Sequence, residues 1–299
     1  MTQIAYFEEI IWPFESNIHS DAKLIEEKVN DWFTMYCESN ELVEKFKKER
    51  LPLFSTRVYN YGTFEKVLAI AKITQYIFRL DEYFTLEDTN LAEKLATKIP
   101  WYFLKNINTA KYKWLRYGFS DVWECVSKLS PEEWNKRQLN SIATSFKARR
   151  LEIEFINDVN PSSLEYLTFR PVADAIDMCF NFIEYASDQY LSFETIAHPF
   201  FQAMIQHCRC IIMATNDLFS YNNEVVYHGN KMSLVLVYQT ELNLLLEQAL
   251  KKVYAYIEEN LKYYLMYKKR VQQTLKQDIQ FYILGLEQLM VGTYEFYFD

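Results

Sequence analysis

Glycine and proline are scarce in this chain, with 5 Gly and 7 Pro among 299 residues. Because both residues interrupt regular structure, their scarcity predicts long helices. The alternation of apolar and polar residues that is typical of strands is almost absent. Half of the residues are hydrophobic, which is enough for a sizeable core. The sequence therefore predicts an all-α bundle, and since no linker or repeat divides it, we expect one domain over residues 1–299.

Several signals of common chemistry are also missing. The chain has no glycine-rich phosphate loop and no Gly-x-Ser-x-Gly elbow, and its four His form no zinc-binding pattern. The five Cys are odd in number and have no Cys-x-x-Cys spacing, so we expect buried, reduced thiols. No secretory signal or membrane span is visible. The net charge of −8, without a long basic stretch, makes nucleic acid an improbable partner. These features favour a cytoplasmic protein.

Hydrophobic spacing predicts where the helices lie. The expected helices cover residues near 21–38, 63–80, 87–104, 110–128, 131–155, 171–186, 194–222, 231–261 and 264–297. We expect the sequence Asn-Pro-Ser-Ser at 160–163 to interrupt the chain, and His198-Pro199 to delay or kink the helix that follows.

The segment from Asn216 to Glu224 carries the strongest chemical signal. An amide, a hydroxyl and a carboxylate stand at Asn216, Ser220 and Glu224. Residues four apart share one face of a helix, so the three side chains project together. Hard oxygen donors of this kind suit Mg²⁺, which keeps open positions for water and phosphate oxygens. The pattern predicts a magnesium site.

A second acidic region follows the helix expected over 63–80. Asp81, Glu82, Glu87 and Asp88 lie within eight residues. Carboxylates at a helix C-terminus face the negative end of the helix dipole, and a bound divalent cation would make that position favourable. The alternative is a solvated acidic loop after a core helix.

Arg170 is the candidate for holding an anion. It lies in an apolar neighbourhood 46 residues before Asn216 (216 − 170 = 46), and its planar fork suits bidentate recognition of phosphate. The alternative is an interior Arg paired with a core acid, Asp174 or Asp177.

Together these motifs resemble those of class I terpene synthases of the bacterial and amoebal type. The residues at 216–224 resemble the second metal motif, Asp81 matches the first Asp of the aspartate-rich motif, and Arg170 matches the diphosphate sensor. The positions that relay diphosphate binding in that family correspond to Ala173 and Asp174. Further resemblance lies in the Trp-Pro-Phe segment at 12–14, in residues 229–236 and in the terminal helix containing Phe296.

The resemblance implies a bundle of the isoprenoid-synthase type, three Mg²⁺ ions and a linear prenyl diphosphate of C15 or C20 that is ionised and cyclised. Asp81, Asn216, Ser220 and Glu224 would hold the metal. Arg170 would bind the diphosphate. Further candidates for the site or the cavity wall are Glu82, Asp174, Lys231, Tyr76, Phe78, Phe180 and Phe296. The abundant Tyr and Phe would stabilise a carbocation through their ring faces, or could simply cover amphipathic helices.

The sequence departs from the family pattern at two places. Asn223 stands where the family often has Lys, and the family's terminal Arg-Tyr pair would fall just beyond Asp299. We therefore expect that a short C-terminal tail is absent, and that the 299-residue form is impaired or trapped open. Two other functions stay open: a prenyl-chain transferase, and a helical isoprenoid-binding or interaction protein without activity. We expect a monomer or homodimer.

Overall fold

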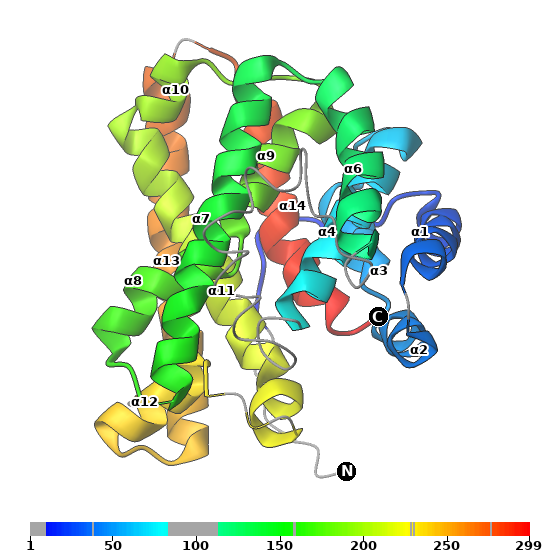
Figure 1. Ribbon diagram of the computed structural model, residues 1–299. Helices are drawn as coiled ribbons and strands as arrows, with labels where there is room; N and C mark the ends of the chain where they lie inside the picture. Colours follow the sequence, from blue (N-terminus) through cyan, green and yellow to red (C-terminus); the bar gives the residue numbers. More distant parts are fainter. Residues whose placement is uncertain are drawn as a thin grey trace.

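The computed structural model describes residues 10–37, 39–82, 113–157, 160–227, 229, 231–275 and 277–299, and within these ranges every regular element is a helix (Figure 1). The elements are α1 (Ala22–Tyr36), α2 (Asn40–Glu49), α3 (Pro52–Val58), α4 (Phe64–Glu82), α6 (Lys113–Lys128), α7 (Glu132–Asn157), α8 (Ser163–Ala173), α9 (Ile176–Ser187), α10 (Phe193–Ala197), α11 (Pro199–Tyr221), the π-helix η3 (Asn222–Tyr227), α12 (Leu234–Leu242), α13 (Leu246–Thr274) and α14 (Gln280–Phe296). The predicted all-α class is confirmed. That one domain spans 1–299 stays a prediction.

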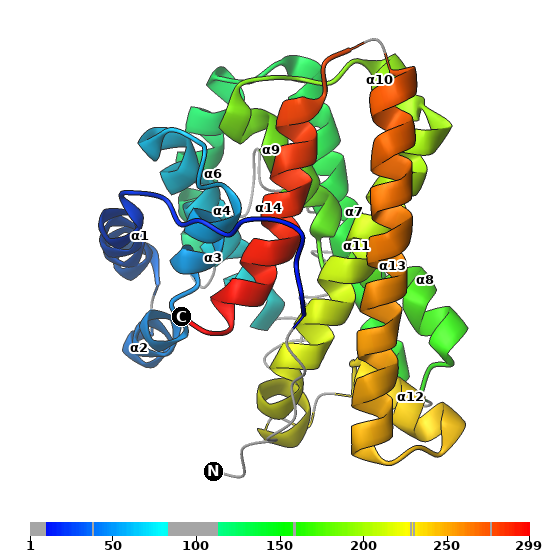
Figure 2. The same cartoon turned by 180° about the vertical axis from the view of Figure 1, so that it is seen from behind.

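Helix α14 runs through the middle of the bundle. It packs against α3, α9 and α11, and α11 in turn packs along α13 (Figure 2). Close approach to α9 depends on Gly285, because a Cβ there would lie 2.3 Å from Ile183 Cγ2 and 2.7 Å from the Tyr61 hydroxyl. The apolar faces of these helices form one continuous core. Its burial is the main stabilising contribution to the fold.

Many aromatic residues belong to this core. Trp134 of α7 is 1 % exposed, stacks on Trp123 and Tyr185, and donates its indole N–H to the Asn181 carbonyl oxygen at 2.9 Å. A buried indole needs such a partner, because an unsatisfied N–H would cost free energy. A substantial part of the aromatic content therefore joins α6, α7 and α9 and is structural.

Several predicted helix boundaries are wrong. The helix expected to begin at residue 171 begins at Ser163, because Ser162 and Glu165 form a capping box there. It ends before Ala175, whose φ of 57° breaks it from α9. The expected helix 231–261 is divided by Asn243 at φ 50°, and α13 then continues to Thr274. Two further helices, α2 and α3, were not expected at all.

Other local expectations agree with the structure. At His198 the backbone is extended, and α11 starts at Pro199, where the missing proline N–H needs no partner. The expected helix 87–104 lies outside the described residues. Among the cysteines, Cys208 and Cys210 are buried, Cys37 and Cys179 are half-buried and Cys125 is exposed, so the expectation of buried thiols is only partly right. All five are free thiols.

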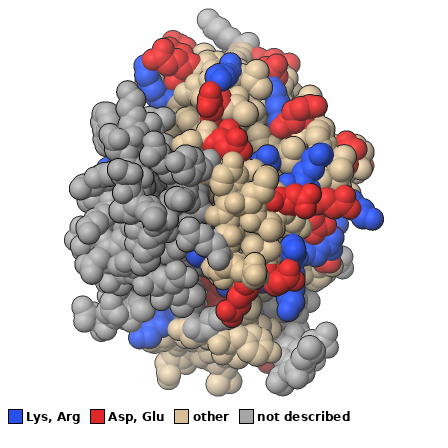
Figure 3. All heavy atoms as spheres, turned by 45° about the vertical axis from the view of Figure 1, so that its right-hand side comes forward, with Lys and Arg blue, Asp and Glu red and all other residues tan. Residues whose placement is uncertain are grey.

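The surface carries both signs of charge. On the face shown in Figure 3, Lys and Arg side chains alternate with Asp and Glu side chains over the described part of that face. Within the described residues, no helix has the length and apolar character needed to cross a bilayer. The cytoplasmic location expected from the sequence stays a prediction.

Candidate functional site

Helix α11 and the residues after α14 meet at one side of the bundle. In both views of the ribbon, α11 continues into η3 at the lower end, whereas α4, which carries Asp81 and Glu82, and α14 end above it (Figures 1 and 2). Residues far apart in the sequence are brought together here, because Tyr297, which follows α14, is hydrogen-bonded to Asn216 near the end of α11. This is where the sequence predicted a site.

The predicted ligands on α11 stand on consecutive turns. Asn216 is half-buried and Ser220 is 7 % exposed, both in the last turns of α11, and the half-buried Glu224 follows in η3. The chain changes from α-helical to π-helical pairing between Ser220 and Glu224, which widens the helix at the carboxylate. Single π-helical turns are rare and frequently occur at functional sites.

Tyr297 connects the chain end to this helix. Its hydroxyl donates a hydrogen bond to Asn216 Oδ1, and its ring stacks on Phe219 at a centroid distance of 5.8 Å. Burial raises the pKa of Tyr297 well above its usual range. The charges of Glu224, Asp174 and Asp217 raise it further, and that of Arg170 opposes them. The phenol therefore contacts Asn216 directly, and the charges of these groups act on its pKa.

Asp217 is the centre of a buried network. Its side chain is 1 % exposed, and its Oδ2 accepts hydrogen bonds from the Tyr166 hydroxyl at 2.7 Å and the Leu234 N–H at 2.8 Å. Burial raises the pKa of Asp217 to about 7, although Arg170 and these two donors oppose the shift. Asp217 thus ties α8 and the start of α12 to α11. The carboxylate also stands at the N-terminus of α12, where the helix dipole favours a negative charge.

Arg170 belongs to the same network. It is 5 % exposed, and its Nη1 lies 2.8 Å from Asp174 Oδ1 and its Nη2 3.7 Å from Asp217 Oδ1. The structure thus shows the pairing with Asp174 that the sequence left open, whereas Asp177 pairs with Arg209 at 2.5 Å. Burial of an arginine requires such partners. The guanidinium of Arg170 is nevertheless close to the metal motif, because its partner Asp217 directly follows Asn216 in α11.

The first acidic cluster is described only in part. Asp81 and Glu82 form the last turn of α4, while Glu87 and Asp88 lie outside the described residues, as do the side chains of Asp81 and Glu82. Phe78, one turn before Asp81, is 40 % exposed. That Asp81 serves as a metal ligand stays a prediction.

The remaining candidates are dispersed. Phe180 is buried beneath the Arg209 guanidinium, 5.6 Å from its ring centre, and Phe296 packs on Phe54 of α3 at 5.9 Å. Tyr76 packs at a tilt against Phe119, with ring centres 5.4 Å apart, and Lys231 is exposed after η3. The structure does not bring these four residues together.

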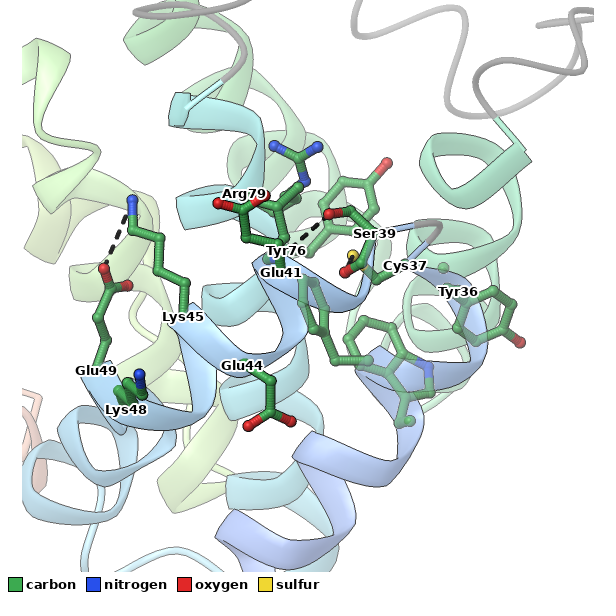
Figure 4. A pocket seen from close by; sticks show the side chains of 14 residues that line it. Tyr36, Cys37, Ser39, Glu41, Glu44, Lys45, Lys48, Glu49, Tyr76 and Arg79 are labelled. Carbon is green, nitrogen blue, oxygen red and sulfur yellow. Dashed lines mark hydrogen bonds and ion pairs between the residues drawn. The ribbon is translucent and has the colours of Figure 1, made fainter.

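A cavity of about 860 Å³ lies elsewhere, between α1, α2, α4 and α6 (Figure 4). Tyr76 and Arg79 face it from α4, and Trp32 and Phe33 from α1. Asn216, Ser220, Glu224 and Arg170 are not among its lining residues. This cavity is therefore not the site predicted by the metal motif.

The donor set at the end of α11 fits a hard divalent cation. Amide, hydroxyl and carboxylate oxygens are ligands of Mg²⁺, and Asn216, Ser220 and Glu224 follow one another at four-residue spacing through α11 and η3. Within the described part of the chain, no three His, Cys, Asp or Glu side chains gather as a metal site. A metal here would therefore be held by mixed donors, as the sequence predicted.

Sequence reasoning did not single out Asp217, Tyr166 or Tyr297. Asp217 is part of the Asn-Asp pattern, but the sequence does not show that Tyr166 of α8 and Leu234 of α12 bond to it. Tyr297 lies 81 positions from Asn216, and no local pattern marks that contact.

The chain is similar in sequence to known proteins. A family model described as terpene synthase family 2, C-terminal metal binding, matches residues 72–263. A 4-epi-cubebol synthase of Streptosporangium roseum, described as (2E,6E)-farnesyl diphosphate cyclizing, is 21 % identical over 263 residues, which are 81 % of this chain and 75 % of that protein. Sesquiterpene synthase 1 of Postia placenta is 23 % identical over 190 residues, covering 60 % of this chain and about half (54 %) of that protein.

Solved structures show the same fold. The crystal structure of a-eudesmol synthase has a TM-score of 0.86 at 18 % identity and covers 98 % of this chain and 99 % of that one. Germacradien-4-ol synthase of Streptomyces citricolor has a TM-score of 0.82 at 15 % identity, covering 97 % and 98 % of the two chains.

Proposed function

The chain belongs to the terpene synthase family, in the group with a C-terminal metal-binding region, and on this premise we propose that it is an Mg²⁺-dependent enzyme that cyclises a linear prenyl diphosphate. The observation that supports this most directly is the position of the Asn216, Ser220 and Glu224 series beside the buried Arg170 network. Metal donors and an anion-binding fork thus lie at one end of one bundle. We propose farnesyl diphosphate, the C15 substrate, because one relative is described as cyclising farnesyl diphosphate and another is named a sesquiterpene synthase.

The roles of the residues follow from their chemistry. Asn216, Ser220 and Glu224, with Asp81 from α4, would hold Mg²⁺, three ions by the family resemblance. When bound, the metal would neutralise the diphosphate and make it a better leaving group. Arg170 would donate two parallel hydrogen bonds to diphosphate oxygens, a geometry that lysine cannot reproduce. To do so, its fork would have to leave Asp174, from which it is now 2.8 Å distant.

The polar network next to Arg170 would keep the fork in place. Asp217 Oδ2 accepts hydrogen bonds from the Tyr166 hydroxyl and the Leu234 N–H, and its Oδ1 faces Arg170. When Asp174 is released, an oxygen of Asp217 still lies 3.7 Å from the buried guanidinium and can act as its acceptor. Exclusion of water from this end of the bundle would protect the allylic cation that forms after ionisation.

Product analysis tests the proposal. The protein is incubated with C10, C15 and C20 prenyl diphosphates and Mg²⁺, and the products are identified by gas chromatography–mass spectrometry while released pyrophosphate is measured. Cyclic C15 hydrocarbons or alcohols, lost in excess chelator, are expected. Longer linear diphosphates formed with added isopentenyl diphosphate would instead identify a chain transferase. Binding without pyrophosphate release would identify a protein without activity.

A further inference from the structure

The end of the chain lies on a predicted metal ligand. The Tyr297 hydroxyl donates its proton to Asn216 Oδ1, the amide oxygen that a cation would use. Its ring stacks on Phe219, which lies between Asn216 and Ser220 on α11. The phenol is also close enough to Glu224 and Asp174 for their charges to act on it. The tyrosine therefore stands on the donor side of the proposed site.

The last residue is fixed at a second place. Asp299 accepts hydrogen bonds from Arg57 of α3, at 2.8 Å from Nε and 2.5 Å from Nη2, and its backbone oxygen lies 3.4 Å from Arg50 Nη1. A bidentate pair of this kind fixes direction as well as distance. Phe298 adds ring contacts to Phe219 at 5.6 Å and to Tyr294 at 4.9 Å. Residues 297–299 are thus held between α3 and α11.

We propose that residues 297–299 form a latch that competes with the metal for Asn216, so that loading of the site requires displacement of the Tyr297 hydroxyl. This inference rests on the proposed metal-dependent function. A proton directed at an amide oxygen leaves a partial positive charge next to it, and a divalent cation on the same oxygen would be repelled by that charge. The hydrogen bond from Tyr297 and a metal bond at Asn216 Oδ1 therefore oppose each other.

The latch lowers apparent affinity without changing the ligands. When only a fraction of molecules is open, the measured dissociation constant increases in inverse proportion to that fraction. The contacts of Asp299 with Arg57 set how large the open fraction is, although neither residue touches the metal motif. Removing either contact point of the latch is thus expected to strengthen metal binding, whereas removing a ligand weakens it.

Isothermal titration calorimetry with Mg²⁺ and inorganic pyrophosphate tests the latch on the full chain. Tyr297→Phe keeps the ring on Phe219 and removes the hydroxyl, and we expect about two- to tenfold tighter binding, the net value of one hydrogen bond. Asp299→Asn, at the exposed chain end, is expected to change affinity in the same direction by a smaller factor. Tyr263→Phe is the matched control, since it removes the hydroxyl of a partly exposed tyrosine on α13, and it should bind like wild type.

Hydrogen exchange gives a second measure that does not depend on turnover. Amide exchange of residues 297–299 should become faster when Mg²⁺ and pyrophosphate are added, and Asn216→Leu should remove this response. Unchanged or weaker binding by Tyr297→Phe would overturn the latch, because the hydroxyl would then be neutral or would position Asn216. If wild type shows no Mg²⁺-dependent binding of pyrophosphate at all, the proposed function itself fails, and the two results are thereby distinguished.

Discussion

Two arginine clusters on neighbouring helices, each with a buried acid, differ in how completely their partners are bonded. Arg137 of α7 pairs with Glu184 of α9 and donates to Asn181 Oδ1 at 3.0 Å, while the Leu191 N–H donates to Glu184 at 2.6 Å. Arg170 of α8 lies 2.8 Å from Asp174 but 3.7 Å from Asp217, whose Oδ1 makes no hydrogen bond within the described residues. We call the first cluster closed, because its arginine and its acid are hydrogen-bonded on both sides. We call the second cluster open, because Asp217 Oδ1, beside the metal motif, can still accept a hydrogen bond.

This difference distinguishes a structural from a functional charge. A closed cluster has its main donors and acceptors bonded to one another and has little to gain from a new ligand. A cluster with an unfilled acceptor holds its arginine less completely, so that an incoming anion can replace one partner. Mutations in the first cluster should therefore change stability, and mutations in and beside the second should change turnover and anion binding.

The largest expected effect is on turnover at the metal motif. Asn216→Leu removes the amide oxygen that we propose as a metal ligand. We expect turnover to fall about 100- to 1,000-fold, as after the loss of one group that stabilises charge in an active site. Thermal unfolding should change little, because the side chain serves the site and not the core. Glu224→Gln is expected to behave alike. Retained turnover in both variants would remove the metal motif from the mechanism.

The next effect concerns stability at the closed cluster. Arg137→Gln leaves the buried Glu184 without its ion-pair partner, and we expect unfolding free energy to fall by about 3 kcal/mol. Urea titration measures this, and turnover per folded molecule should stay near wild type. Lys136→Gln is the matched control, because Lys136 forms an exposed pair with Glu132 on the same helix and should change stability by less than about 1 kcal/mol. A selective loss of turnover in Arg137→Gln would contradict the comparison.

A smaller effect is expected at the open cluster. Arg170→Lys keeps the charge but cannot form two parallel hydrogen bonds, so we expect kcat/KM to fall about 10- to 100-fold, the value of a charge-assisted contact. Pyrophosphate affinity should fall with it. Arg209→Lys, whose partner is Asp177, is the control and should keep both quantities. If Arg170→Lys loses stability but keeps pyrophosphate affinity, the pairing with Asp174 is purely structural.

The sequence predicted what depends on neighbouring residues. Asn216 and Ser220 lie one turn apart on α11 because helical spacing is local, and Pro199 marked a helix start for the same reason, whereas Glu224 follows in the π-helix η3, which the spacing did not predict. The sequence could not predict that Asp217 contacts Arg170 and Tyr166, because these contacts depend on the packing of α8 against α11. The breaks at Ala175 and Asn243 were also missed, because in both a residue other than glycine adopts positive φ.

The smallest expected effect is a pH dependence of stability from Glu184. Burial raises the pKa of this carboxyl above its usual range, and Arg137 only partly opposes the shift. Between the unfolded and the folded pKa, the native protein holds a proton that the unfolded chain has lost, so stability decreases as pH rises through this window. Above the folded pKa the decrease stops. Glu184→Gln has no carboxyl that titrates in this window. As pH rises above about 4.5, wild type should therefore lose unfolding free energy relative to the variant, by at most about 1.4 kcal/mol per pH unit. Urea titrations at half-unit intervals measure it, and a difference that is constant with pH would show that the Arg137 pair fully offsets the burial of Glu184.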